Sequence, residues 1–128
     1  MNTGFPKEER LKSKKVLEQL FAQGKAVNAF PFKLIYREDV LPTEVPYQLA
    51  VVAPKKHFKS AVDRNRIKRL LREGYRLHKA TIFNNTKGQY ALVILYLGKE
   101  IPTFSQVEKG VSLLLSKFLK QVLHEKSS

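Results

Sequence analysis

Apolar residues recur at helical spacing in three parts of the chain. The first lies between Ser13, a residue type that often caps helices, and Gly24, which is expected to end the helix as a C′ glycine. The second is predicted over Ala61–His78, with apolar side chains on one side of the helix and basic ones on another. The third is predicted to begin at Ser105–Glu108 (SQVE), which matches a capping box, and to run to about His124.

Three other segments have strand character. Residues 30–37 alternate between apolar and mixed positions, and residues 47–53 (YQLAVVA) follow after an acidic, proline-containing loop. This pair predicts an antiparallel hairpin with a wide turn. Residues 90–97 (YALVILYL) are nearly all apolar, as in a strand covered on both faces. The order helix, strand, strand, helix, strand, helix predicts an α+β two-layer sandwich with one sheet.

Composition and charge indicate what kind of partner the protein binds. The chain has 128 residues, which favours a single domain, and 43% of them are hydrophobic, enough to fold. There are 24 Lys and Arg residues against 11 Asp and Glu, a formal net charge of +13. The excess is concentrated in residues 55–79, which hold ten basic and two acidic side chains. This distribution predicts a fixed cationic patch and a polyanionic partner.

The basic helix offers the chemistry of phosphate recognition. Its Arg side chains can grip phosphate through forked donors, and a helix holds them without the ordering entropy of a loop. Asn65 is a poor helix former among arginines, which favours a hydrogen bond to a phosphate, a sugar or a hydrated metal ion. The alternative is an ordinary solvated face, but Asp63 and Glu73 are too few to pair the surrounding cations.

The sequence offers little for catalysis, redox chemistry or membrane insertion. It contains no cysteine, which excludes disulfides, thiolate zinc sites and cysteine nucleophiles. The three histidines are far apart and no glycine-rich phosphate loop occurs, so no catalytic residue is assigned. No segment approaches the ~18 apolar residues of a membrane helix, and the first ten residues lack the apolar core of a signal peptide. A cytoplasmic protein with no membrane partner is expected.

One block of sequence resembles a known family. Lys55-Lys56, seven further residues and then Arg64-Asn65-Arg66 with the following IKRLLRE resemble the bacterial ribonuclease P protein component. That family is the small basic subunit which assists a catalytic RNA in removing the 5′ leader of precursor tRNA. The resemblance also includes Arg10-Leu11-Lys12, the LFAQG at residues 20–24, Phe32 and residues 91–96, and covers roughly residues 9–122.

The resemblance implies features of the fold that periodicity does not reveal. It implies a four-stranded mixed sheet in α-β-β-β-α-β-α order, similar to the second domain of ribosomal protein S5. It also implies a left-handed βαβ crossover, against the general right-handed rule. The additional strand is expected near Lys25–Asn28. A single domain is expected over residues 1–128, ordered from about residue 9 to 124, with mobile ends.

The resemblance further implies two RNA-binding regions. The catalytic RNA is expected to contact Lys55, Lys56, Lys59, Arg64, Asn65, Arg66, Lys68, Arg69 and Arg72. The single-stranded leader is expected in a cleft between the first helix and the sheet, lined by Lys14, Lys15, Leu17, Phe21, Lys33 and Ile35. Leu17 and Ile35 stand where the family commonly has aromatic residues, which weakens base stacking worth about 1–3 kcal/mol per base. The loop at residues 57–60 also lacks the family's usual glycine and is one residue longer.

The function implied is that of a non-catalytic subunit of the ribonuclease P holoenzyme, an endoribonuclease. It would be a monomer alone, bind the catalytic RNA 1:1 and help to position precursor tRNA. The Mg²⁺ needed for hydrolysis would be held mainly by the RNA, with Asn65 near the ions.

Three alternatives remain open at this stage. The first is a ribosomal or other ribonucleoprotein assembly protein without a role in tRNA processing. The second is a self-sufficient basic nuclease, for which the chain lacks a cluster of carboxylates or histidines. The third is binding to anionic membranes, which would require Ile67, Leu70 and Leu71 to lie outside the core.

Overall fold

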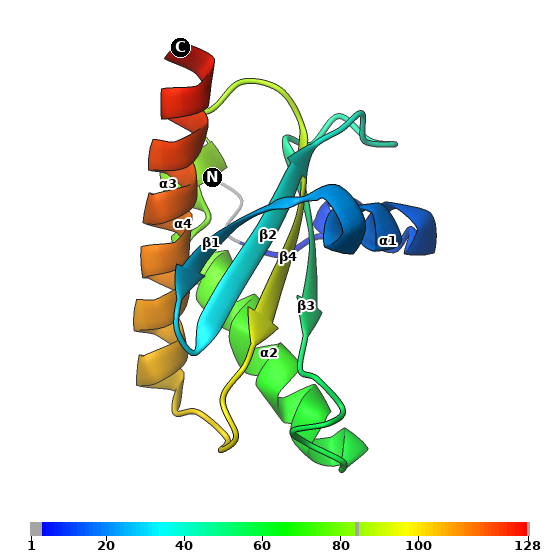
Figure 1. Cartoon of the computed structure of the whole chain (residues 1–128), viewed down its shortest axis with the longest axis vertical. Coiled ribbons are helices and arrows are strands. Elements are labelled where there is room, and N and C mark those ends of the chain that lie inside the picture. The colour runs from blue at the N-terminus through cyan, green and yellow to red at the C-terminus, as the bar shows by residue number, and fades with distance from the viewer. Residues whose placement is uncertain (1–3, 84, 128) are drawn as a thin grey trace.

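The most apolar strand of the chain, β4 (Tyr90–Tyr96), lies inside a four-stranded sheet (Figure 1). The computed structural model describes residues 4–83 and 85–127. The sheet has the order β1-β2-β4-β3, with β1 at Lys25–Ala29, β2 at Phe32–Glu38 and β3 at Tyr47–Val52. All seven residues of β4 are buried, which confirms the prediction of a strand covered on both faces. The additional strand expected near residues 25–28 is confirmed as β1.

The predicted hairpin between residues 30–37 and 47–53 is wrong. β2 pairs antiparallel with β4 and β3 pairs parallel with it, so β4 separates the two strands of the expected hairpin. A strand that is apolar on both faces is best buried at the centre of the sheet. The alternation of residues within β2 and β3 does not show that another strand lies between them. The tight hairpin is instead β1–β2, with Phe30 and Pro31 in its turn, so β2 begins at Phe32.

Helices cover the two faces of the sheet unequally (Figure 1). One face carries α2 (Ala61–His78), α3 (Ala80–Phe83) and α4 (Phe104–Ser127), and the other carries α1 (Lys14–Gln23). Successive residues of a strand point to opposite faces, so Leu34 joins the larger core while Ile35 joins the smaller one. The fold is the predicted α+β sandwich, with α1 lying across part of the second face. The bounds of α2 are as predicted.

The order of elements agrees with the one implied by the resemblance. The chain runs α1-β1-β2-β3-α2-β4-α4, with η1 (Lys7–Glu9) before α1 and the short α3 after α2. The left-handed crossover and the similarity to ribosomal protein S5 stay predictions.

The two ends of α1 are determined by different contacts. Ser13 caps the helix as predicted, because its Oγ accepts a hydrogen bond from the Val16 N–H at 3.2 Å. Gly24 follows the helix but has φ −72°, so it is not the left-handed C′ glycine that was predicted from its position. Glycine is needed there because a Cβ would lie 2.5 Å from Ile35 Cγ2. The close approach of β2 to the helix end therefore explains this residue.

α4 is capped two residues earlier than the predicted Ser105. Thr103 Oγ1 accepts from the Gln106 N–H at 3.2 Å, and Gln106 Oε1 accepts from the Thr103 N–H at 3.0 Å. This is a reciprocal capping box on a neighbouring set of residues. The helix continues to Ser127, beyond the predicted end at His124.

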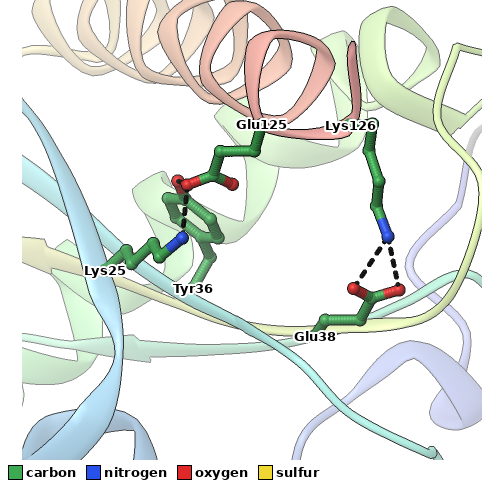
Figure 2. Close-up of polar contacts among 5 residues, drawn as sticks. All are labelled: Lys25, Tyr36, Glu38, Glu125 and Lys126. Carbon is green, nitrogen blue, oxygen red and sulfur yellow. Dashed lines mark hydrogen bonds and ion pairs between the residues drawn. The ribbon is translucent and has the colours of Figure 1, made fainter. Parts of the chain in front are cut away.

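Figure 2 shows the contacts that hold the end of α4 against the sheet. The Glu125 carboxylate accepts hydrogen bonds from Lys25 Nζ at 2.6 Å and from the Tyr36 hydroxyl at 3.3 Å. Lys126 Nζ lies 2.9 and 3.0 Å from the two carboxylate oxygens of Glu38. Residues 125 and 126 therefore have defined partners on the sheet, and the mobility of the ends stays a prediction.

The N-terminal segment is anchored as well. The Phe5 ring packs edge-on against Tyr75 of α2, with ring centroids 5.8 Å apart. Ordered structure therefore begins before the predicted residue 9. Residues 1–3 and 128, which belong to the predicted mobile ends, lie outside the described residues.

The contact between Tyr36 and Glu125 predicts a loss of stability at alkaline pH. Burial and the neighbouring Glu125 carboxylate raise the pKa of Tyr36 to about 12, from about 10 in an unfolded chain. A raised tyrosine pKa stabilises the fold below pH 10, and this contribution is lost as the pH rises through 12. Urea unfolding between pH 9 and 12 should show the free energy of unfolding falling less steeply for Tyr36→Phe than for the wild type. Identical slopes would contradict the assignment.

Candidate nucleic-acid interface

α2 separates its apolar and basic side chains onto different sides. Ile67, Leu71 and Tyr75 are fully buried between the sheet and the other helices. Asn65, Arg69 and Arg72 are exposed on a different side of the helix. Since residues three and four apart lie on one helix face, these polar side chains form a row along α2. The helix therefore presents rigidly spaced cations, and Ile67, Leu71 and Tyr75 are committed to the core.

Most basic side chains of this region have no acidic partner in the described part of the chain. Within residues 4–83 and 85–127, no ion pair is formed by Lys55, Lys56, Lys59, Arg64, Arg66, Lys68, Arg69 or Arg72. Arg76, one turn further along α2, differs because its Nε donates to Glu73 Oε2 at 3.0 Å. A solvated helix face usually mixes charges of both signs. The unpaired positive charge thus favours the phosphate-binding interpretation over an ordinary surface helix.

The loop before α2 is held in place by its own residues. Phe58 is buried and stacks on Tyr96, with ring centroids 6.1 Å apart. Arg64 Nη1 donates to the carbonyl oxygens of Phe58 at 2.8 Å and Lys59 at 2.9 Å. His57 Nδ1 also lies 3.2 Å from the Gly98 carbonyl oxygen. The loop thus presents exposed lysines from a fixed backbone, and Arg64 has a structural role that sequence reasoning did not assign to it.

Asn65 is exposed and its side chain forms no hydrogen bond with the described part of the protein. It therefore remains available to a ligand, and its predicted role stays a prediction. The surroundings do not form a metal site of their own, since no group of three His, Cys, Asp or Glu within the described residues could hold an ion.

Some of the predicted leader-binding residues are exposed, and others pack with the smaller core. Lys14 and Lys15 are exposed at the start of α1, and Phe21 is 49% exposed near its end. Leu17 is only half-buried but packs with the smaller core, and Ile35 is 8% exposed beneath the same helix. The apolar surface that a base could contact is therefore mainly that of Phe21.

Lys33 completes the predicted leader-binding set. It is half-buried on the same face of β2 as Ile35, because the two residues are two positions apart in one strand. The neighbouring Arg37 on that face donates through Nη1 to Gln19 Oε1 of α1 at 3.1 Å. This contact helps to fix α1 over the strand.

Sequence reasoning missed the position of Arg10. The motif Arg10-Leu11-Lys12 carried part of the resemblance but received no role. In the structure the Arg10 guanidinium lies over the Phe5 ring, which packs against Tyr75 of α2, and burial together with the Arg10 charge lowers the pKa of Arg72. The N-terminal segment therefore adds cations beside the basic helix. The missed signal was the local excess of basic residues before the first helix.

No helix in the described part of the chain combines the length and apolar character needed to cross a membrane. The apolar face of α2 is also covered, because Ile67 and Leu71 are 0% exposed. Binding of this helix to lipid is therefore not supported.

Sequence comparison relates this chain to ribonuclease P proteins. The family model described as Ribonuclease P matches residues 5–119. The chain is 33% identical over 111 residues to the ribonuclease P protein component of Porphyromonas gingivalis, covering 84% of this chain and 81% of the relative. It is 44% identical over 73 residues to that of Nitrosococcus oceani, covering 57% and 59% of the two chains.

Solved structures show the same fold. The Staphylococcus aureus RNase P protein superposes with a TM-score of 0.69 at 21% identity, covering 88% of this chain and 96% of that one. The Thermotoga maritima RNase P protein gives a TM-score of 0.68 at 24% identity, covering 85% and 96%. The mixed four-stranded sheet with its helices is therefore shared by these proteins.

Proposed function

We propose that this chain, which belongs to the ribonuclease P protein family, binds the catalytic RNA through α2 and the loop before it. As a member of that family, it is the protein subunit of a holoenzyme that removes the 5′ leader of precursor tRNA. The supporting observation is the exposure of Arg66, Arg69 and Arg72 on a rigid helix, where they form no ion pair within residues 4–83 and 85–127. Each phosphate contact releases counterions, so binding through this surface depends strongly on salt. The contacts are those of Lys55, Lys56, Lys59, Arg64, Asn65, Arg66, Lys68, Arg69 and Arg72.

The second part of the proposal concerns the leader. Lys14, Lys15 and Lys33 supply positive charge around α1 and β2, and Phe21 supplies an exposed ring. Single-stranded RNA is bound by this combination of stacking and cations. Since Leu17 and Ile35 contribute mainly to packing, leader binding here relies on one aromatic residue and on charge.

The third part concerns Mg²⁺. The α2 surface is cationic and its described residues form no cluster of acidic ligands, so it suits phosphate rather than a divalent cation. We therefore propose that the ions required for hydrolysis are held mainly by the RNA, with Asn65 facing this region. The protein neutralises phosphate charge and raises the affinity of the complex for its substrate.

The proposed stoichiometry is one protein per catalytic RNA, and the proposed location is the cytoplasm. The protein binds one catalytic RNA, is a monomer without it, and works in the cytoplasm on precursor tRNA. A role confined to ribosome assembly is not favoured, because the relatives described above are ribonuclease P proteins.

Reconstitution tests this function. Adding the protein to the catalytic RNA at limiting Mg²⁺ should increase the rate of precursor-tRNA cleavage, because the protein neutralises phosphates that otherwise repel the substrate. The measurement is the rate of leader release in single-turnover assays. The protein alone should release no leader. No gain in cleavage at any Mg²⁺ concentration would exclude the proposal, and cleavage by the protein alone would favour a self-sufficient nuclease.

A further inference from the structure

The N-terminal segment passes around the edge of the sheet from one face to the other. Phe5 packs in the larger core beside α2, whereas Leu11 packs in the smaller core beside α1. Between them the backbone follows the outer edge of β3, where the Leu11 N–H donates to the Leu49 carbonyl oxygen at 2.9 Å. The segment therefore connects the α2 surface with the start of α1.

A basic groove lies along this segment. It has a volume of about 380 Å³ and is lined by Lys7, Arg10, Lys12 and Ser13, with Glu8 as the acidic side chain among its lining residues. The backbone beside it is fixed, because the Glu8 carbonyl oxygen accepts from Gln48 Nε2 at 3.0 Å. A groove of this size and charge suits an anionic ligand.

Arg10 is held at the end of this groove nearest α2. Its Nε donates to the Phe5 carbonyl oxygen at 3.3 Å, and its guanidinium lies 5.2 Å from the centre of the Phe5 ring. Phe5 in turn packs against Tyr75 of α2. The residue before Arg10, Glu9, forms a buried ion pair with Lys79 at 2.8 Å. The Arg10 guanidinium is thus positioned before any ligand binds.

Arg10 reaches α2 through the Phe5 ring, which packs against Tyr75, and Arg72 lies three residues before Tyr75 on that helix. Neither forms an ion pair with a carboxylate among the described residues. Burial and the Arg10 charge both lower the pKa of Arg72, as expected for two cations brought together without an anion. A phosphate bound at Arg10 would offset this unfavourable charge and accept charge-assisted hydrogen bonds from the Arg10 guanidinium group.

We infer that Arg10, Lys12 and Lys7 form a second phosphate-binding site, which carries the RNA backbone from the α2 surface around the edge of β3 to the start of α1. This inference rests on the proposed function and extends it to residues outside the basic helix. The ligand is the sugar-phosphate backbone, either of the catalytic RNA or of the substrate leader.

Binding measurements on the full chain test the site. Arg10→Ala with Lys12→Ala should weaken RNA binding by about tenfold at low salt and reduce the slope of log affinity against log salt by about 1.5. The matched control is Lys109→Ala with Lys120→Ala, which removes the same charge from exposed positions on α4. The melting temperatures of both variants should stay close to that of the wild type.

Two ligands distinguish the sources of the phosphate. Weaker binding of the isolated catalytic RNA assigns the site to that RNA. Weaker binding of leader-bearing precursor tRNA, but not of leaderless tRNA, to the reconstituted holoenzyme assigns it to the leader. If Arg10→Ala/Lys12→Ala behaves like the α4 control with both ligands while changes on α2 weaken binding, this inference is wrong and the proposed function stands. If changes on α2 also have no effect, the proposed function fails.

Discussion

Replacing Glu9 by alanine is expected to lower the free energy of unfolding by about 3–5 kcal/mol. The side chains of Glu9 and Lys79 are 7% and 5% exposed and form a 2.8 Å ion pair. Lys79 Nζ also donates to the Gly4 carbonyl oxygen and lies 5.0 Å from the centre of the Phe83 ring. Removal of the carboxylate leaves a buried ammonium group without its counterion, which is costly in a medium of low polarity.

Urea unfolding followed by circular dichroism measures this effect. Glu8→Ala is the matched control, because the adjacent carboxylate is exposed, and its effect should stay within about 0.5 kcal/mol. The double variant Glu9→Met/Lys79→Met removes both charges and should recover most of the lost stability, since buried ion pairs are often replaceable by apolar residues. A Glu9→Ala variant as stable as the wild type would show that this ion pair does not anchor the N-terminal segment.

Replacing Arg69 and Arg72 together by alanine is expected to weaken binding of the catalytic RNA by more than about 100-fold. Hydrogen bonds to charged groups contribute about 1.5–3 kcal/mol each, and loss of two contacts should lower the salt slope by about 1.4–1.8. Both side chains are exposed and form no ion pair within residues 4–83 and 85–127, so the melting temperature should change little. Fluorescence anisotropy with labelled RNA over a range of salt concentrations measures both quantities.

The reciprocal variant is Leu71→Ala. Leu71 is fully buried on the apolar side of the same helix, so its truncation should lower the free energy of unfolding by about 2–5 kcal/mol. RNA affinity of the folded fraction should be unchanged, because the exposed row of cations is retained. A large loss of stability with unchanged affinity for the Arg69→Ala/Arg72→Ala variant would instead mean that these arginines are structural.

Much of the secondary structure follows from local sequence. Ser13 and the apolar period over residues 61–78 act within one or two helical turns, and the structure has α1 and α2 where these signals predict them. The continuous apolar run of residues 90–96 correctly indicated a strand buried on both faces. The cap of α4 was missed because Thr103 and Ser105 both offer a hydroxyl, and only the geometry selects Thr103.

The candidate site was less completely predictable. The row of cations on α2 could be predicted because charge and helical period are both local properties. The structural role of Arg64 could not, since it depends on how the loop at residues 57–60 folds back toward the helix. Ile35 is a similar case: its burial results from the position of α1 above β2, which alternation within the strand does not report.

By itself, the sequence determined that this is a folded protein with a high net positive charge, concentrated on one amphipathic helix. Composition and helical period show this because neither depends on contacts between distant parts of the chain. Only the tertiary structure decided that β4 separates β2 from β3 and that Arg10 lies over Phe5, which packs against α2. Both features depend on contacts between residues that are far apart in the sequence. These contacts bury the apolar faces of the helices and strands, and the Glu9–Lys79 ion pair, at the least cost in free energy. Because of these contacts, the basic surface of α2 continues along the N-terminal segment around the edge of the sheet.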